Sequence, residues 1–234
     1  MTELGLTDKA RVTTKLHPEL DLSAPARLEQ AVESSLNNLN LNRLAGLLLH
    51  KESHLNKIDH IMISYLINLK EKGAVKQIGV SVYTPARALT ALNMDLFDII
   101  QFPASLIDRR FEQAKVFDLA RKKDKLIYVR SVFLQGLLLM EPENLPPKMN
   151  FARPVLEQVS QLGCKLGLSP AQMALAYVKV SHPGARVLFG AETVDQVKQN
   201  VRHWASEPPV GIKEAARLLE GVDERIINPT LWPL

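Results

Sequence analysis

The sequence lacks several features that would point to particular classes of protein. Its 234 residues contain one cysteine, Cys164, which excludes an internal disulfide and any metal site built from several cysteines, and predicts a reducing compartment. No apolar run reaches the length of a membrane span, and the N-terminus has neither the basic start nor the apolar core of a signal peptide. The net charge of +4 comes without a basic cluster interleaved with aromatics. We therefore expect a cytoplasmic protein without a metal, membrane or nucleic-acid partner.

The most informative stretch that is present is an apolar run, residues 44–50, which ends in a histidine. Such a run is typical of a strand buried on both faces, as in a parallel sheet covered by helices. In these folds the carboxyl ends of the strands build the site, so His50 stands where a catalytic group is expected. A hydrogen-bonded structural histidine fits the same position, and position alone leaves both interpretations open.

Strand and helix patterns alternate along the chain. Apolar or β-branched runs predict strands at residues 12–16, 44–50, 75–82, 98–102, 126–132 and 186–189. Helical spacing and capping residues predict helices at about 24–40, 58–72, 85–93, 111–123, 154–166, 170–180 and 193–204. Residues 137–150 are rich in proline and predict a loop. No composition break divides the chain, so residues 1–234 are expected to form a single βα-repeat domain.

Two α/β architectures fit this alternation, a doubly wound sheet and a (β/α)8 barrel. No Gly-x-Gly-x-x-Gly follows a strand, which removes the main argument for a doubly wound dinucleotide site. Several predicted strands instead end in a polar or small residue: Lys15, His50, Ser81, Gln101, Ser131 and Gly190. A barrel assembles its site from the ends of many strands, so these endings favour the barrel.

Six motifs at or just beyond the strand ends together carry a resemblance. They are Val-Thr-Thr-Lys (12–15), Leu-Leu-Leu-His (47–50), Ile-Gly-Val-Ser (78–81), Gln-Phe-Pro-Ala-Ser-Leu-Ile-Asp-Arg-Arg (101–110), Arg-Ser-Val-Phe-Leu-Gln-Gly (130–136) and Gly-Ala-Glu-Thr-Val-Asp-Gln-Val-Lys-Gln-Asn (190–200). In this order the set resembles the aldo/keto reductase family. The resemblance implies a TIM-type (β/α)8 barrel, here incomplete with about six βα units, and an NAD(P)H-dependent reduction of an aldehyde or ketone to an alcohol.

The resemblance also implies roles for individual residues. Lys15 matches the lysine that lowers the pKa of a proton-donating tyrosine, and His50 matches the histidine that orients the substrate carbonyl or assists proton transfer. The positions that match cofactor-binding residues are Ser81 and Gln101 at the nicotinamide carboxamide, Arg130 against the nicotinamide ring, Ser131, Phe133 and Gln135 at the pyrophosphate, and Gly190, Thr193, Gln196 and Asn200 at the adenosine. Taken singly, each of these residues has an ordinary structural explanation, such as an exposed helix face for Gln196 and Asn200.

The sequence departs from the family pattern at several of these positions. Val82 stands where the family has an asparagine that contacts the carboxamide, and Ser105 replaces a frequent asparagine. Gly190 and Gln196 stand where NADP-preferring members often carry lysine and arginine, which removes two partners for a 2′-phosphate. The cofactor is therefore expected to be NADP or NAD, with NADPH slightly favoured by the family and not by the residues.

The largest departure concerns the start of the chain. The family places two βα units before the lysine strand, and these hold the catalytic Asp and the Tyr that serves as general acid. The sequence begins at what resembles the end of the second helix, so the resemblance implies an N-terminally shortened member. Among the tyrosines present, only Tyr83 follows a predicted strand end. Because a missing proton donor costs a factor of about 10²–10⁴, we expect weak turnover or none.

Two functions and one mode of assembly follow as expectations. The first function is a reductase of small carbonyl compounds, impaired by the loss of the Asp and Tyr, and the alternative is a non-catalytic nucleotide-binding or scaffolding protein. No residue identifies the substrate. Six βα units leave the first and last strands with open edges, which predicts a homo-oligomer through those edges; the alternatives are an open or distorted barrel and a shorter, altered barrel that closes.

Overall fold

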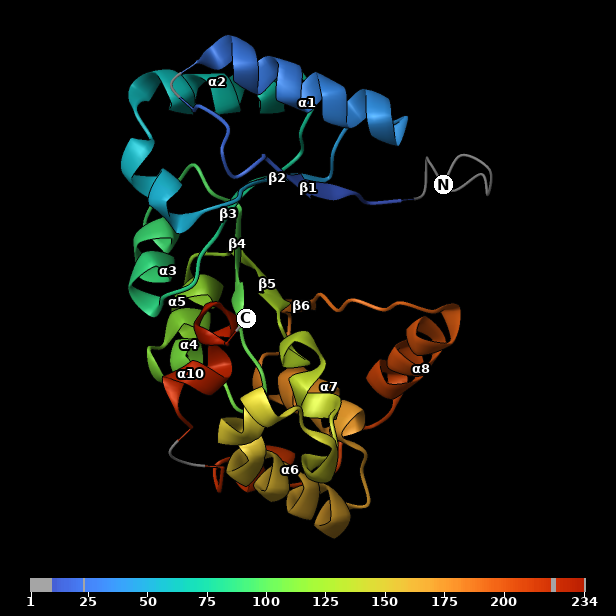
Figure 1. Ribbon diagram of the computed structural model, residues 1–234. Helices are drawn as coiled ribbons and strands as arrows, with labels where there is room; N and C mark the ends of the chain where they lie inside the picture. The colour runs from blue at the N-terminus through green and yellow to red at the C-terminus, as the bar shows by residue number, and fades with distance from the viewer. Residues whose placement is uncertain (1–9, 23, 220–221, 234) are drawn as a thin grey trace. The chain divides into compact units, whose positions relative to one another are not determined.

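The computed structural model describes residues 10–22, 24–219 and 222–233 (Figure 1). Six strands form one sheet in the order β1-β2-β3-β4-β5-β6. The strands are β1 (Thr13–Lys15), β2 (Gly46–Leu49), β3 (Ile78–Ser81), β4 (Ile99–Pro103), β5 (Leu126–Arg130) and β6 (Arg186–Val187). The strand pairs β1–β2, β2–β3, β3–β4 and β5–β6 are parallel, which agrees with the predicted βα repeat.

The helices up to residue 205 fall close to their predicted positions, and two short helices beyond it were not predicted. They are α1 (Pro25–Leu39), α2 (His60–Glu71), α3 (Pro85–Leu92), α4 (Arg110–Gln113), α5 (Val116–Lys122), α6 (Arg153–Leu166), α7 (Pro170–Ser181), α8 (Val194–Ala205), α9 (Ile212–Ala216) and α10 (Glu224–Ile227). The helix expected at 111–123 is split into α4 and α5 because Lys115, between them, has a φ of 59°. Residues 134–152 form short 3-10 turns, Leu134–Leu139, Pro142–Asn144 and Pro147–Ala152, within and beside the expected loop.

The chain divides into two compact units. The first comprises residues 1–102 and 115–127, and the second comprises residues 103–114 and 128–234. The expectation of a single domain over residues 1–234 stays a prediction.

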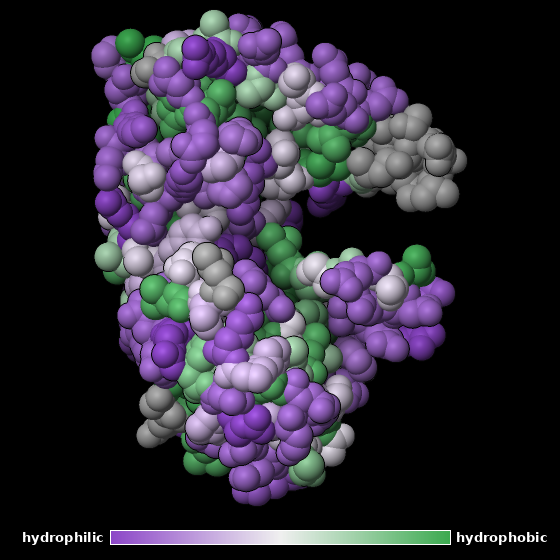
Figure 2. All heavy atoms as spheres, in the orientation of Figure 1, coloured by the Kyte–Doolittle hydropathy of each residue, from purple (hydrophilic) through white to green (hydrophobic). Residues whose placement is uncertain are grey.

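In the first unit, the strand predicted at residues 44–50 is confirmed as β2, and all four of its residues are buried. Figure 1 shows α1 and α2 side by side above β1 and β2, and Figure 2 shows a largely hydrophilic surface over these two helices. Local sequence explains the helix starts. Asp59 accepts a hydrogen bond from the Met62 amide at the start of α2, and Thr84 accepts one from the Arg87 amide at the start of α3.

In the second unit, α7 packs against α6, α8 and α9. Its residues Met173–Val178 are buried without a break, so this helix forms the core of the unit. Ser169 starts α7 with a capping box, in which its side chain accepts from the Gln172 amide and the Gln172 side chain accepts from the Ser169 amide. On α6, Cys164 is exposed.

Within the described residues, no helix is both long and apolar enough to cross a bilayer. The same residues contain no group of three or more histidine, cysteine, aspartate or glutamate side chains that could hold a metal ion.

Candidate active site

The ends of β1, β3 and β4 bring three predicted site residues together in the first unit. Lys15 Nζ donates to Ser81 Oγ at 3.3 Å, and Ser81 Oγ donates to Gln101 Oε1 at 3.3 Å. Each is at or near the carboxyl end of its strand, and Ser81 and Gln101 are register partners in the parallel sheet. Ser81 and Gln101 are buried, while Lys15 is half-buried. These three polar strand ends therefore meet at one edge of the sheet, and their catalytic and cofactor-binding roles stay predictions.

His50 lies at the end of β2, between these strands in the sheet order. Burial lowers the pKa of its imidazole, and the positive charge of Lys15 lowers it further, while a hydrogen bond with the Leu16 backbone opposes the shift. His50 is therefore mainly neutral near pH 7. A neutral imidazole beside a lysine ammonium presents one N–H donor and one acceptor without adding a second positive charge.

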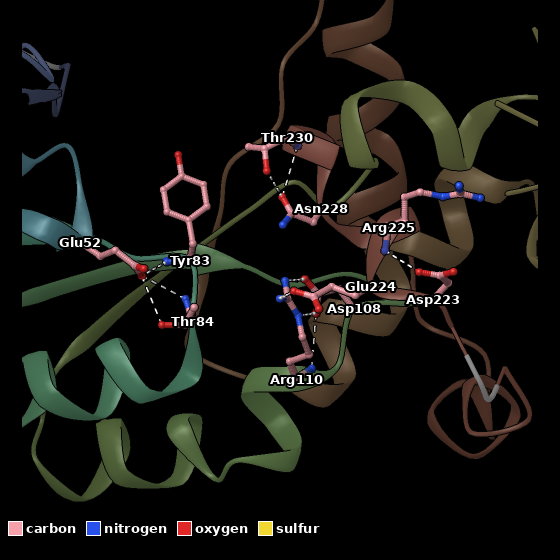
Figure 3. A network of polar contacts seen from close by, with 10 residues as sticks. All are labelled: Glu52, Tyr83, Thr84, Asp108, Arg110, Asp223, Glu224, Arg225, Asn228 and Thr230. Carbon is pink, nitrogen blue, oxygen red and sulfur yellow. Dashed lines mark hydrogen bonds and ion pairs between the residues drawn. The ribbon is translucent and has the colours of Figure 1, made fainter. Parts of the chain in front are cut away.

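Glu52 is a residue of this region that the sequence analysis did not select. It follows β2, in the 3-10 turn Glu52–Lys57, and its Oε2 accepts from the Tyr83 amide at 2.8 Å, from the Thr84 amide at 3.2 Å and from Thr84 Oγ1 at 3.3 Å (Figure 3). The carboxylate thus ties the segment after β2 to the turn after β3. Figure 3 shows the phenol ring of Tyr83 pointing away from Glu52. The signal in the sequence that could have found Glu52 is its position, two residues after the strand-end His50.

Comparisons with known proteins show the family of the chain. A sequence model of the Aldo/keto reductase family matches residues 5–218. The chain belongs to this family. The predicted resemblance is thereby confirmed, and it extends across nearly the whole described chain.

Solved aldo-keto reductases share the fold. An aldo-keto reductase from Bacillus halodurans, in its apo form, has a TM-score of 0.74 at 24% identity over 94% of this chain and 76% of its own. Its holo form has a TM-score of 0.72 at 25% identity over 92% and 74%. A glycerol dehydrogenase from Gluconobacter oxydans has a TM-score of 0.71 at 23% identity over 90% and 72%. The predicted α/β fold, a partial TIM-type (β/α)8 barrel, is confirmed.

One curated relative is clearly longer than this chain. Pyridoxine 4-dehydrogenase from Escherichia coli (strain K12) is 26% identical over 204 residues, which are 85% of this chain and 64% of the relative. The chain thus spans less than two thirds of the length of that relative.

In the second unit, the loop after β5 holds the next group of predicted cofactor residues of this aldo/keto reductase chain. Arg130 Nη1 donates to Ser131 Oγ at 3.2 Å, and the Phe133 ring lies 6.4 Å from the ring of Phe189, centroid to centroid. The φ angles of Ser131, Leu134, Gln135 and Gly136 are 62°, 49°, 53° and 88°. Three non-glycine residues in the left-handed region within so short a loop are strained, and such strain is concentrated at functional sites.

The predicted adenosine-end residues lie at α8 and just before it. Thr193 Oγ1 accepts from the Gln196 amide at 3.2 Å, and Gln196 Oε1 accepts from the Glu192 amide at 2.7 Å, so these two side chains cap the helix. Asn200 is buried, and a Cβ at Gly190 would meet open space. The structural explanation from the sequence, an exposed helix face, holds for Gln196 and is wrong for Asn200, which is buried. The cofactor roles of these residues stay predictions.

The positions that depart from the family pattern have structural contacts. Val82 is buried, and its amide donates to the Gln101 carbonyl at 2.8 Å. Ser105 is buried, and its Oγ accepts from the Asp108 amide at 3.0 Å. Asp108 in turn forms a two-bond ion pair with Arg110, at 2.9 Å from both Nε and Nη2 (Figure 3). Hydrogen bonding to buried Asp108 raises the pKa of Arg110. Hydrogen bonds within the turn itself therefore fix the conformation of residues 105–110.

Three of the four tyrosines are in the interior of regular elements. Tyr65 lies within α2, where burial raises its pKa to about 12. Tyr128 is buried in β5. Tyr177 is buried in α7, and its hydroxyl donates to Glu112 Oε2 at 2.7 Å. Burial raises the pKa of Tyr177 well above its usual range, and the bond to Glu112 raises it further. Tyr83 is at the strand-end rim, with 41% of its surface exposed.

Proposed function

We propose that the chain supplies the lysine, histidine and nicotinamide-binding side of an NAD(P)H-dependent carbonyl reductase site. The observation that carries this proposal is the hydrogen-bonded series from Lys15 through Ser81 to Gln101 at the carboxyl ends of neighbouring strands, with His50 at the end of the strand between them. Membership of the aldo/keto reductase family, whose relatives include named reductases and dehydrogenases, supports this reaction type.

The buried Ser81–Gln101 pair fits a nicotinamide carboxamide. Gln101 uses Oε1 to accept from Ser81 Oγ, which turns its Nε2 amide, a two-proton donor, away from that bond. A carboxamide needs one donor for its oxygen and one acceptor for its nitrogen, and an amide side chain beside a hydroxyl offers both kinds of group. Val82 offers no polar group in place of the family asparagine, so we expect the pair to bear most of this recognition.

His50 and Lys15 are suited to the carbonyl end of the reaction. When bound, the reduced nicotinamide supplies a hydride to the carbonyl carbon. His50, neutral near pH 7, has one N–H, which bonds to the Leu16 backbone in the chain alone; in the complex this N–H is donated to the carbonyl oxygen instead and orients it. The Lys15 ammonium stabilises the negative charge that develops on that oxygen.

The proton source decides between turnover and binding alone. Reduction to an alcohol consumes one proton at the carbonyl oxygen, and Tyr83 is the tyrosine placed at the rim. The interior positions of Tyr65, Tyr128 and Tyr177 favour a second candidate function, a nucleotide-binding protein that reduces carbonyl compounds slowly or not at all. The cofactor is NADPH or NADH, and small aldehydes or ketones are the substrate class.

The test is a fluorescence titration of the purified chain with NADPH and with NADH, followed by addition of an aldehyde panel. Ser81→Ala and Gln101→Ala should each weaken nucleotide binding about tenfold, since each removes one or two hydrogen bonds. Gln158→Ala, at an exposed position on α6, is the matched control and should bind as the parent does. Absence of nucleotide binding by the folded parent chain would contradict both candidate functions.

Turnover separates the two candidates. If the parent chain reduces an aldehyde and Tyr83→Phe lowers kcat about a hundredfold while nucleotide binding is kept, Tyr83 is the proton donor. Binding with no turnover on any aldehyde supports the nucleotide-binding protein.

A further inference from the structure

The pairing between β2 and β3 ends just before the strand-end residues of the proposed site. The last register pair of these two strands is Leu49 with Val80. His50 and Ser81 are the next residues along the two segments. The pairing of β3 with β4 continues one residue further, to Ser81 with Gln101. Backbone pairing therefore holds Ser81 to β4, whereas its position relative to His50 depends on contacts beyond the paired residues.

The Glu52 carboxylate supplies a contact between these two segments. Its Oε2 accepts from two consecutive amides, those of Tyr83 and Thr84, shortly after Ser81 (Figure 3). Hydrogen bonds to a charged acceptor are stronger than those between neutral groups. Thr84 is also the residue at which α3 starts, so the carboxylate lies at the amino end of that helix, where the helix dipole favours a negative charge. Glu52 thus links the two segments where the backbone pairing of the strands has ended.

The 3-10 turn that carries Glu52 is itself anchored. Its residues His54 and Leu55 are buried. The His54 imidazole also bonds to the backbone of Pro18, in the loop after β1. Because a proline has no N–H, the imidazole N–H is the donor and the Pro18 carbonyl is the acceptor. The carboxylate therefore extends from a turn that is held in place, and it can hold the turn after β3 in place in its turn.

We propose that Glu52 is a positioning residue of the nicotinamide site, which holds the turn after β3 against the segment after β2 and so fixes Ser81 relative to His50. It acts through the backbone amides of Tyr83 and Thr84. This role rests on the proposed function, because Ser81 and His50 belong to the same strand-end site.

Fluorescence titration with NADPH tests the role on variants of the full chain, each checked for folding by far-UV circular dichroism. Glu52→Ala removes the acceptor of both amides and should raise the NADPH dissociation constant about tenfold. Glu52→Gln keeps an acceptor oxygen in the same place and should raise it by less than about threefold. If Glu52→Ala does not fold, Glu52→Asp takes its place with the same expectation, because its shorter side chain withdraws the carboxylate from the amides.

The matched control is Asn56→Ala, in the same 3-10 turn. Asn56 Oδ1 accepts from Arg87 Nη1 on α3 at 2.8 Å. The variant therefore loses another bond between this turn and α3 while it leaves the amides of Tyr83 and Thr84 with Glu52. It should bind NADPH as the parent does.

A second readout needs no nucleotide. In Glu52→Ala, the amides of Tyr83 and Thr84 should exchange their hydrogens at least about tenfold faster than in the parent. The NMR resonances of Ser81 and His50 should shift in the same variant and stay in place in Asn56→Ala.

The two readouts separate the possible failures. A folded parent that binds no nucleotide contradicts the proposed function. Unchanged Ser81 and His50 resonances in Glu52→Ala overturn the positioning role, whether or not nucleotide binds. A parent that binds NADPH no better than Glu52→Ala also overturns the positioning role, and so does an equal loss of binding in Asn56→Ala.

Discussion

The strand-end cluster of the first unit and the loop and helix residues of the second unit differ in how firmly the fold determines their side chains. Lys15, Ser81 and Gln101 are held by parallel register between buried strands, and their side chains bond to one another. Thr193 and Gln196 lie on exposed surface, where their side chains cap α8. At a buried strand end a polar side chain has few hydrogen-bond partners to choose from, whereas at an exposed helix start the helix's own backbone amides supply its partners. A polar side chain therefore indicates function more strongly at the buried strand ends of the first unit than at the exposed start of α8.

Substituting one glycine in each of these two regions tests the contrast, and the largest loss of stability is expected in the first unit. A Cβ at Gly79, in β3, would lie 2.4 Å from the Ile99 carbonyl oxygen and 2.4 Å from a Leu48 methyl group, so the three strands would have to separate. Gly79→Ala should lower the free energy of unfolding by about 3 kcal/mol. Gly190→Ala is the control, because its Cβ would meet nothing within 4 Å. Chemical denaturation measures both, and equal stability of the two variants would contradict the close packing of β3.

Lowering the pH should reduce the free energy of unfolding through a buried histidine of the second unit, His182. Burial lowers the pKa of His182 to about 4, and nearby Lys213 lowers it while Glu112 opposes the shift. Because the folded-state value lies below the ordinary 6.5, the stabilisation is present above about pH 6.5 and is lost as the pH falls toward 4. The free energy of unfolding should fall by about 2 kcal/mol between about pH 7.5 and pH 5 from this group.

His182→Asn should remove most of that loss, and His203→Asn, on α8, serves as its control. The readout is the difference in unfolding free energy between the two pH values for each variant. An undiminished loss in His182→Asn would show that other groups cause the acid sensitivity.

The sequence predicted elements better than it predicted side-chain roles. Buried strands such as β2 and capped helices such as α7 follow from local patterns, because apolar runs and the Ser169 capping box each favour one structure. The break at Lys115 was not predictable, since a left-handed lysine has no local signal. The role of Glu52 was also missed, because its partners, the amides of Tyr83 and Thr84, are about thirty residues away. Long-range contacts to backbone amides leave no periodic pattern.

The two helix caps allow a smaller test. Ser169→Ala removes the cap of α7, whose buried residues form the core of its unit, and should lower the global free energy of unfolding by about 1 kcal/mol. Thr193→Ala removes the cap of exposed α8 and should mainly fray that helix, with a change of about 0.5 kcal/mol or less. Chemical denaturation measures the change in the global free energy of unfolding, and amide hydrogen exchange measures the local opening of α8. Equal global losses would show that α8 unfolds only with the rest of its unit.

The smallest effect concerns electrostatics within the strand-end cluster. After burial, the charge that lowers the pKa of His50 most is Lys15, and the charge that lowers the pKa of His54 most is Lys57. Lys15→Met should therefore raise the pKa of His50, and Lys57→Met should raise that of His54 while leaving His50 as it is. Titration of the two imidazoles by NMR measures both shifts in the same samples. If Lys15→Met left the pKa of His50 unchanged, the lysine charge would be too far or too well screened to act at the carbonyl oxygen that His50 is proposed to orient, and the proposed division of roles between these two residues would fail.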